Sequence, residues 1–258
     1  MTDQSVGAGT PLGVGQIVGE SFSLLFKRFF IFFILAFVPT LLSFIISTAY
    51  FGTGVYTGQG DPTAMLNAMT NPVGIIVMFV VPMVIYGLST ALIVCAAYDA
   101  KLGKPARLGQ YFTIALARAV PITLVSIVVG ILAGIGMLFL IIPGLYIAAM
   151  LSVAVVTVVL ESQWFGSLGR SMQLTKDYRW PVLGTLILLY LVILVLNLIL
   201  GLFAVFLFTA SPVIGIVVYS VFGSVGSALL AIGFVLIYAR LREIKEGVSV
   251  DTLAEVFS

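Results

Sequence analysis

The chain of 258 residues contains no histidine, a single cysteine and few charges, since Lys, Arg, Asp and Glu together make up only 9% of it. An ordinary soluble domain carries about 25% charged residues. Without histidine, a Ser–His–Asp triad, a Cys–His pair and a histidine-based zinc site are all excluded. One cysteine excludes an internal disulfide and a thiolate metal cage. We therefore predict that the protein is not an enzyme and that it has no catalytic residue, metal site or cofactor.

The residues that remain are strongly apolar. Hydrophobic residues make up 61% of the chain, and the mean hydropathy is +1.24. A soluble fold of this length cannot bury so much apolar surface, so the composition indicates an integral membrane protein and excludes a nucleic-acid binder. About 20 apolar residues are needed to cross a bilayer. Six segments reach or approach that length, namely Phe29–Phe51, Val73–Ala97, Ala119–Ile141, Leu145–Leu160, Val182–Thr209 and Val213–Ala239.

All basic residues lie on one side of these predicted spans. They precede span one, lie between spans two and three or four and five, or follow span six, whereas the connections 52–72, 142–144 and 210–212 hold none. Cytoplasmic loops of membrane proteins are enriched in Lys and Arg. We therefore predict cytoplasmic residues 1–28 with an interfacial helix, a six-span domain over 29–239, and a cytoplasmic tail over 240–258.

The three opposite connections are predicted to differ in structure. Pro143-Gly144 and Ser211-Pro212 lie in connections so short that spans three and four, and spans five and six, are expected to form tight antiparallel hairpins. In the longer connection, Asp61 is followed by Pro62, a pair typical of an N-cap and a first helical residue. This pattern predicts a short surface helix that ends near Thr70.

Each predicted hairpin follows a semi-polar stretch that ends at an arginine. These stretches are Phe22–Arg28, Phe112–Arg118 and Met172–Arg179. The first two have apolar residues at helical spacing, as in helices that lie in the membrane interface with a basic side chain reaching the headgroups. The fold predicted is thus all-α, with three hairpins each preceded by a cytoplasmic interfacial segment. Two interpretations remain, a true structural repeat or the basic flank of any span entered from the cytoplasm.

Few polar residues lie where they could bind something. Two hypotheses apply to Arg28, Arg118 and Arg179. They bind anionic lipid headgroups, or they only determine how the spans are oriented across the membrane. Within the spans, Asn197, Ser126 and Ser224 are candidates either for a hydrogen bond to a neighbouring helix, typically about 1 kcal/mol or less, or for contact with a ligand. The predicted spans hold no charged residue, although ion-coupled carriers usually keep such residues in their spans.

Other residues suggest how the helices are arranged. Small residues four apart allow close helix packing, either within the chain or between copies; they are Gly130 and Gly134 in span three, and Gly223 and Ser227 in span six. Pro39 and Pro82 predict kinks in spans one and two, which can open a cavity between the helices. Glu161 and Arg170 bracket the end of span four, where an ion pair, simple solvation and a functional site are the alternatives.

Motifs spread over most of the chain carry a resemblance to a known family. They comprise Gly144–Tyr146, the apolar run that ends in Glu161, Leu168–Ser171, Leu174-Thr175 and Arg179-Trp180, together with Glu20–Phe22, Gly103–Pro105 and Leu108-Gly109. This pattern is similar to bacterial six-span proteins known as the membrane domain of glycerophosphoryl diester phosphodiesterase, or as the YciC-like uncharacterised family. The resemblance implies six spans in a bacterial inner membrane. In the phosphodiesterases a separate soluble domain uses histidines and metal-binding carboxylates, so no catalytic residue is carried over to this chain.

Two functional hypotheses follow from these observations. The first is a non-enzymatic scaffold or assembly partner of a larger membrane complex, with membrane lipids, other membrane subunits or a second copy as partners. The alternative is a protein that binds or transports a lipid or small solute in a cavity between spans one, two and five. A cavity that touches Asn197 favours the alternative, whereas a packed interior with an exposed face of small residues favours the scaffold.

Overall fold

The computed structural model describes residues 11–52 and 62–247, and within these ranges every regular element is a helix. Six helical segments are long and apolar enough to cross a membrane. They are Phe29–Phe51, Pro72–Lys101, Ala119–Leu138, Ile141–Glu161, Arg179–Leu200 and Val213–Glu246. The predicted all-α bundle of six spans is confirmed, and the chain is a multi-pass membrane protein.

Shorter helices precede some of the spans, and spans two and four are themselves divided into shorter helical segments. In chain order the helices are α1 (Val14–Lys27), α2 (Phe29–Phe51), α4 (Pro62–Thr70), α5 (Pro72–Ile75), the π-helix η1 (Ile76–Val80), α6 (Val81–Lys101), α7 (Leu108–Ala117), α8 (Ala119–Phe139), α9 (Ile141–Leu151), α10 (Ala154–Glu161), α11 (Gly166–Thr175), α12 (Arg179–Ala210) and α13 (Pro212–Glu246). Helix α4 confirms the predicted surface helix, although its expected N-cap, Asp61, lies outside the described residues. The tail over 248–258 also lies outside them.

Each of the three hairpins follows a short helix. The span begins after a single non-helical residue in the first two hairpins, whereas three residues, Lys176, Asp177 and Tyr178, separate the short helix from the span in the third. Arg28 has φ −127° and ψ 39°, Arg118 has φ −110° and ψ 11°, and Tyr178 has φ −117° and ψ 10°. The one-residue break thus recurs in the first two units, which favours a structural repeat there, while the third unit has a longer link with Asp177 at φ 68°.

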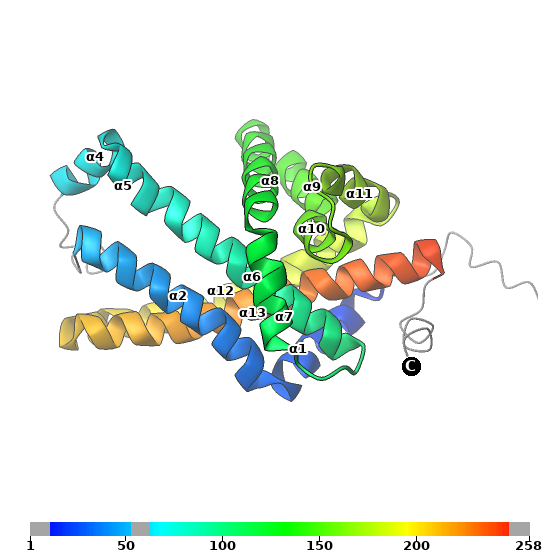
Figure 1. Ribbon diagram of the computed structural model, residues 1–258, viewed down its shortest axis with the longest axis horizontal. Coiled ribbons are helices and arrows are strands. Elements are labelled where there is room, and N and C mark those ends of the chain that lie inside the picture. Colours follow the sequence, from blue (N-terminus) through cyan, green and yellow to red (C-terminus); the bar gives the residue numbers. More distant parts are fainter. Residues whose placement is uncertain (1–10, 53–61, 248–258) are drawn as a thin grey trace, which may run out of the picture.

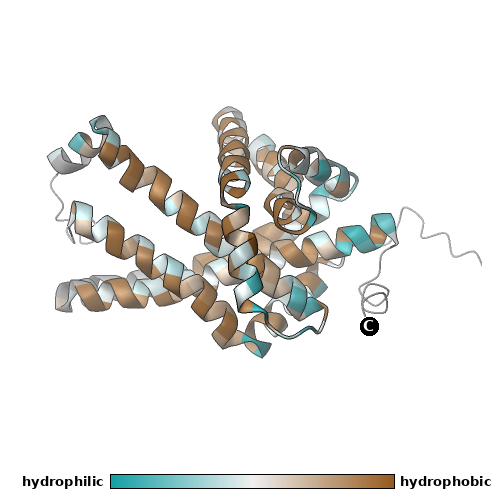
Figure 2. Ribbon diagram, in the orientation of Figure 1, coloured by the Kyte–Doolittle hydropathy of each residue, from teal (hydrophilic) through white to brown (hydrophobic). Residues whose placement is uncertain are grey.

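The spans are arranged as a fan. Helices α2, α6, α12 and α13 run toward the same side, whereas α8 and α9 point away from them (Figure 1). Helix α13 is central, because it packs against α12, α2, α1 and α6. Hydrophilic residues gather near the end of α13 and around α7 and α11, whereas the spans are hydrophobic along most of their length (Figure 2).

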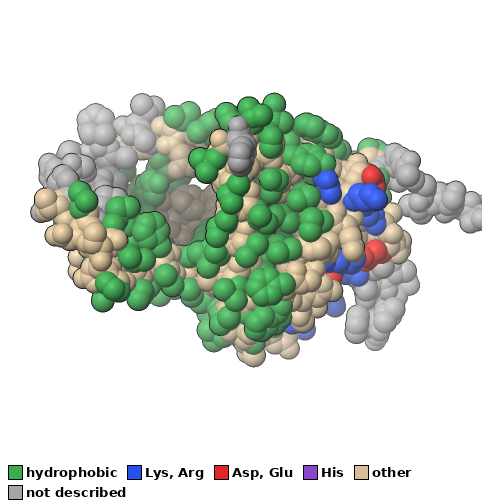
Figure 3. All heavy atoms as spheres, turned by 90° about the horizontal axis from the view of Figure 1, so that it is seen from above, with side chains coloured by type: hydrophobic (Ala, Val, Ile, Leu, Met, Phe, Trp, Pro, Cys, Tyr) green, Lys and Arg blue, Asp and Glu red, His purple; other side chains and the backbone are tan. Residues whose placement is uncertain are grey.

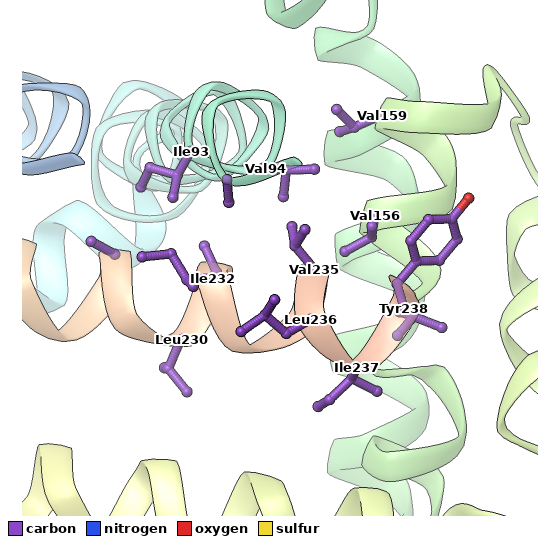
Figure 4. Packing of buried hydrophobic residues seen from close by; sticks show 14 of the residues in the cluster. Ile93, Val94, Val156, Val159, Leu230, Ile232, Val235, Leu236, Ile237 and Tyr238 are labelled. Atoms are coloured by element: carbon purple, nitrogen blue, oxygen red, sulfur yellow. The ribbon is translucent and has the colours of Figure 1, made fainter. Parts of the chain in front are cut away.

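The buried core lies toward the end of the molecule that carries the Lys and Arg residues, which we call the basic end (Figure 3). Its main parts are the second half of α6, helix α10 and residues 228–241 of α13 (Figure 4). Ile17 and Leu25 of α1 belong to the same core, so α1 packs on the spans as part of one unit. The opposite halves of the spans expose large apolar side chains such as Leu138 and Phe203, which is the surface expected to face lipid.

The turn between spans three and four differs from the prediction. It lies at Leu140, whose φ is −162° and ψ 145°, and α9 begins at Ile141, so span four has 21 residues. Proline is accepted in the first turn of a helix because its missing N–H has no partner there. Pro143 and Gly144 therefore belong to the helix rather than to the turn. Gly144 is needed for contact, since a Cβ there would lie 2.6 Å from the backbone nitrogen of Met137 in α8.

Span four is interrupted between Leu151 and Ala154 without any proline. The carbonyl of Met150, in the last turn of α9, accepts a hydrogen bond from Ser171 Oγ at 2.9 Å, and Thr175 Oγ1 lies 3.0 Å away and shares its one proton between this carbonyl and the carbonyl of Ser171. Both hydroxyls belong to α11 and both side chains are buried. An unpaired carbonyl within a membrane is costly, so α11 satisfies the group that the break exposes.

Candidate functional site

The three arginines predicted to bind headgroups lie in separate units, and each contacts groups of the protein itself. Arg28 donates to the carbonyl of Lys104 at 2.6 Å. Arg118 donates to the last carbonyls of α10, and Arg179 donates to the hydroxyl of Tyr146 at 2.7 Å and lies over its ring. The end carbonyls of a helix have no partner within it, so arginine is a suitable donor. Binding of headgroups by these arginines stays a prediction.

The Glu161–Arg170 ion pair is confirmed, with Arg170 Nε 3.0 Å from Glu161 Oε2. Tyr238 of α13 donates its hydroxyl to Glu161 at 2.7 Å, and Arg170 also pairs with Glu246 at the end of α13. Glu161 thus connects α10, α11 and α13 at the basic end. These contacts explain why α11, the short helix before the third hairpin, is fixed on the bundle.

A second polar group joins α6 to α7, and sequence reasoning missed it. The carboxylate of Asp99, which is 8% exposed, accepts hydrogen bonds from Arg107 at 3.0 Å and from the hydroxyl of Tyr111 at 2.7 Å. Burial raises the pKa of Tyr111 to about 12, so its phenol stays protonated and donates at neutral pH. The sequence held one signal for this ion pair: Asp99 follows an apolar run directly and lies eight positions before Arg107.

A cavity of about 350 Å³ lies between α2, α6 and α13. We call it the hydroxyl chamber, because its walls include the side chains of Thr40, Ser43, Ser47, Tyr86, Ser89 and Ser227. These residues come from segments far apart in the chain, and the three helices that carry them pack against one another. The chamber gathers hydroxyl groups within a membrane domain that is otherwise strongly apolar.

The chamber lies beside the two prolines that predicted kinks. Pro39 has no N–H, so the carbonyl of Leu35 one turn earlier loses its usual helical partner. Ser89 Oγ of α6 donates to that carbonyl at 3.1 Å, which joins α6 to α2. Pro82 follows the π-helix η1, and both prolines line the chamber. A cavity is present beside the two prolines, as expected, but its third wall is span six rather than span five, and kinks at Pro39 and Pro82 stay a prediction.

Span five contributes to a second cavity, which we call the amide chamber because Asn197 lines it. It measures about 150 Å³ and lies between α6, α12 and α13. Asn197 Nδ2 donates to the carbonyl of Ile193 in its own helix at 2.8 Å. Tyr86 and Ser227 line both chambers, so the two cavities adjoin.

The other predicted residues take different positions. Ser126 is half-buried on α8 and lines neither chamber, and Ser224 is buried and donates to a carbonyl of its own helix at 2.7 Å. A Cβ on Gly130, Gly134 or Gly223 would meet no atom within 4 Å, so no described helix packs closely against these glycines. All three glycines are exposed, and Gly223 also lines the amide chamber.

No protein-family model, no curated protein and no solved structure matches the chain. The resemblance to the YciC-like six-span family therefore stays a prediction. Among residues 11–52 and 62–247, no three His, Cys, Asp or Glu side chains are grouped so that they could hold a metal ion. The two chambers are the arrangement on which a functional proposal can be built.

Proposed function

We propose that this multi-pass membrane protein binds an amphipathic, lipid-like molecule from the bilayer in its two chambers. The hydroxyl chamber is the observation that carries the proposal. Its volume of about 350 Å³ lies within the roughly 300–1,000 Å³ of small-molecule sites. Six hydroxyl side chains surround a space between spans whose other residues are largely apolar, which suits a ligand with both polar and apolar parts.

The hydrogen bonding of these hydroxyls supports the proposal. Thr40, Ser89 and Ser227 donate to backbone carbonyls. Within the described part of the chain, Ser43 and Ser47 have no hydrogen-bond partner. A polar group in apolar surroundings costs about 1–3 kcal/mol when it stays unpaired. A ligand that bonds with Ser43 and Ser47 therefore gains energy that an apolar occupant does not.

The proposed activity is binding rather than catalysis. No charged side chain lines either chamber, and the chain has no histidine, so hydrogen bonds and apolar contacts are the forces available to hold a ligand. We place the protein in a bacterial inner membrane with its basic end in the cytoplasm. The distribution of Lys and Arg and the family resemblance support this placement.

The Gly223→Leu variant tests the proposal. Gly223 lines the amide chamber and a Cβ there would meet no atom within 4 Å, so a leucine side chain is expected to narrow that chamber without straining the fold. We expect a lipid-like adduct, seen by native mass spectrometry after gentle extraction of the parent protein, to be lost from this variant. Gly184→Leu is the matched control, because Gly184 also has no neighbour within 4 Å and lines neither chamber. The same adduct on all three proteins contradicts the proposal.

A second candidate function, a subunit of a membrane complex, is favoured by the exposed face of α8. Gly130 and Gly134 lie one turn apart there, beside the exposed Ile131, and a small-residue pair of this kind lets a second helix approach closely. Replacing both glycines by leucine is expected to convert an assembled species to a single chain in native mass spectra. An unchanged assembly argues against this face as the contact.

A further inference from the structure

We infer that the ligand is an uncharged lipid whose hydroxyl-bearing head lies in the hydroxyl chamber and the first carbons of whose hydrocarbon chain lie in the amide chamber. This inference rests on the proposed function and adds the chemical class and the orientation of the molecule bound. It follows from the different walls of the two chambers and from the residues that they share.

The hydroxyl chamber is suited to a head with neighbouring hydroxyl groups. Ser43 and Ser47 both line it and lie four residues apart in α2. Side chains at this spacing lie one above the other on a helix, with Cβ atoms about 5–6 Å apart. Two hydroxyls at such a separation can each bond with one of two oxygens on adjacent carbon atoms of a ligand. Ser89 and Ser227 add hydroxyl oxygens on the facing helices.

Because the walls of the two chambers carry no charge, the head of the bound lipid is expected to be uncharged as well. None of the residues that line either chamber is Asp, Glu, Lys or Arg. An ion in such surroundings has no partner of opposite charge, and burial without a partner is strongly unfavourable. A phosphate-bearing head is therefore disfavoured, and an alcohol, glycerol or similar neutral head is favoured.

The amide chamber is suited to the hydrocarbon chain. Most of its wall is apolar, with Ile193, Leu196 and Leu200 from α12 and Phe222 and Leu230 from α13. Its one amide group already donates to a backbone carbonyl of its own helix. Apolar ligand surface is favoured in such a space because it is contacted by apolar side chains rather than by unpaired polar groups.

The shared residues allow one molecule to occupy both chambers. Tyr86 and Ser227 line each of them, so the polar and apolar spaces meet at this pair. Tyrosine presents an apolar ring and a polar hydroxyl, which suits the boundary between a head and a chain. The bound lipid would thus run from α2, past α6 and α13, to α12.

Photo-crosslinking of the full chain tests the class and the orientation together. The protein is placed in vesicles of phosphatidylcholine that contain either a monoacylglycerol or a phosphatidylglycerol probe, each with a diazirine on the part of its chain next to the head. We expect the monoacylglycerol probe to label peptides 193–200 and 222–230, with competition by unlabelled monoacylglycerol. The combined change Ser43→Ala and Ser47→Ala is expected to raise the half-saturating probe concentration about tenfold, as for the loss of two modest hydrogen bonds.

Matched variants separate loss of recognition from loss of fold. Ser126→Ala removes a hydroxyl outside the chambers and should leave labelling unchanged, and the combined Ser43→Thr and Ser47→Thr should retain it because the hydroxyls remain. The neutral-head inference is overturned, while the proposed function stands, by either of two results. One is preferential labelling of the same peptides by the phosphatidylglycerol probe, and the other is an unchanged half-saturating concentration in the alanine variant. The proposed function itself is overturned if both probes label the protein and Gly223→Leu does not reduce that labelling.

Discussion

The Asp99→Ala variant is expected to lose about 2–3 kcal/mol of unfolding free energy. Asp99 is buried and accepts hydrogen bonds from Arg107 and from the hydroxyl of Tyr111, a residue that is only 2% exposed. Alanine leaves that hydroxyl buried without its acceptor. Because the Arg107 side chain is 47% exposed, water can replace its lost partner, which keeps the loss below that of a fully buried ion pair.

Denaturant titration in detergent micelles, followed by tyrosine and tryptophan fluorescence, measures this loss. Glu243→Ala is the matched control, since it breaks the Arg240–Glu243 pair, whose two side chains are 30% and 41% exposed, and should change stability by less than about 1 kcal/mol. Adding Tyr111→Phe to Asp99→Ala should restore part of the loss, because no buried hydroxyl is then left unpaired. Equal losses of unfolding free energy for Asp99→Ala and Glu243→Ala would contradict a stabilising role of the hydrogen bonds at Asp99.

The Gly144→Leu variant is expected to weaken the hairpin of α8 and α9 by about 1–3 kcal/mol or more, the usual effect of overpacking. A Cβ at this position would lie 2.6 Å from the nitrogen and 2.8 Å from the Cα of Met137. These are backbone atoms within a helix, so they cannot rotate away as a side chain can. The two helices must move apart, and their contact along the hairpin is reduced.

Gly184→Leu is again the matched control, since a side chain there meets no neighbour within 4 Å. Both changes replace glycine by a good helix former, so the difference between them reports crowding rather than helix propensity. The stability of both variants is measured in the same micelles as that of the parent protein. A Gly144→Leu protein as stable as Gly184→Leu would show that α8 and α9 do not need their close contact.

Features that depend on short stretches of sequence were predictable. The spans follow from runs of apolar residues, and the turn at Ser211 follows from a proline that begins the next helix. Pro143 shows the limit of that reasoning, because a proline in the first turn of a helix looks the same in sequence as a proline within a turn. The structure resolves the ambiguity through Leu140, whose extended backbone separates α8 from α9.

The walls of the chambers were not predictable, because they depend on which faces of distant helices meet. Asn197 stood out as an amide in an apolar run, and it lines a chamber. Ser43 and Ser47 did not stand out, since single hydroxyls are common in spans, although their spacing of four residues places them on one helix face. Ser89 joins them only because α6 packs against α2, a contact between residues about 50 positions apart.

The break in span four has a consequence for the order of synthesis. The carbonyl of Met150 is satisfied by Ser171 and Thr175, which are translated some 20 residues later. Until α11 exists, an interrupted span would leave that carbonyl unpaired in the bilayer, at a cost of several kcal/mol. The nascent span is therefore expected to enter the membrane as one continuous helix. It acquires its break only when α11 folds back and supplies the two hydroxyls.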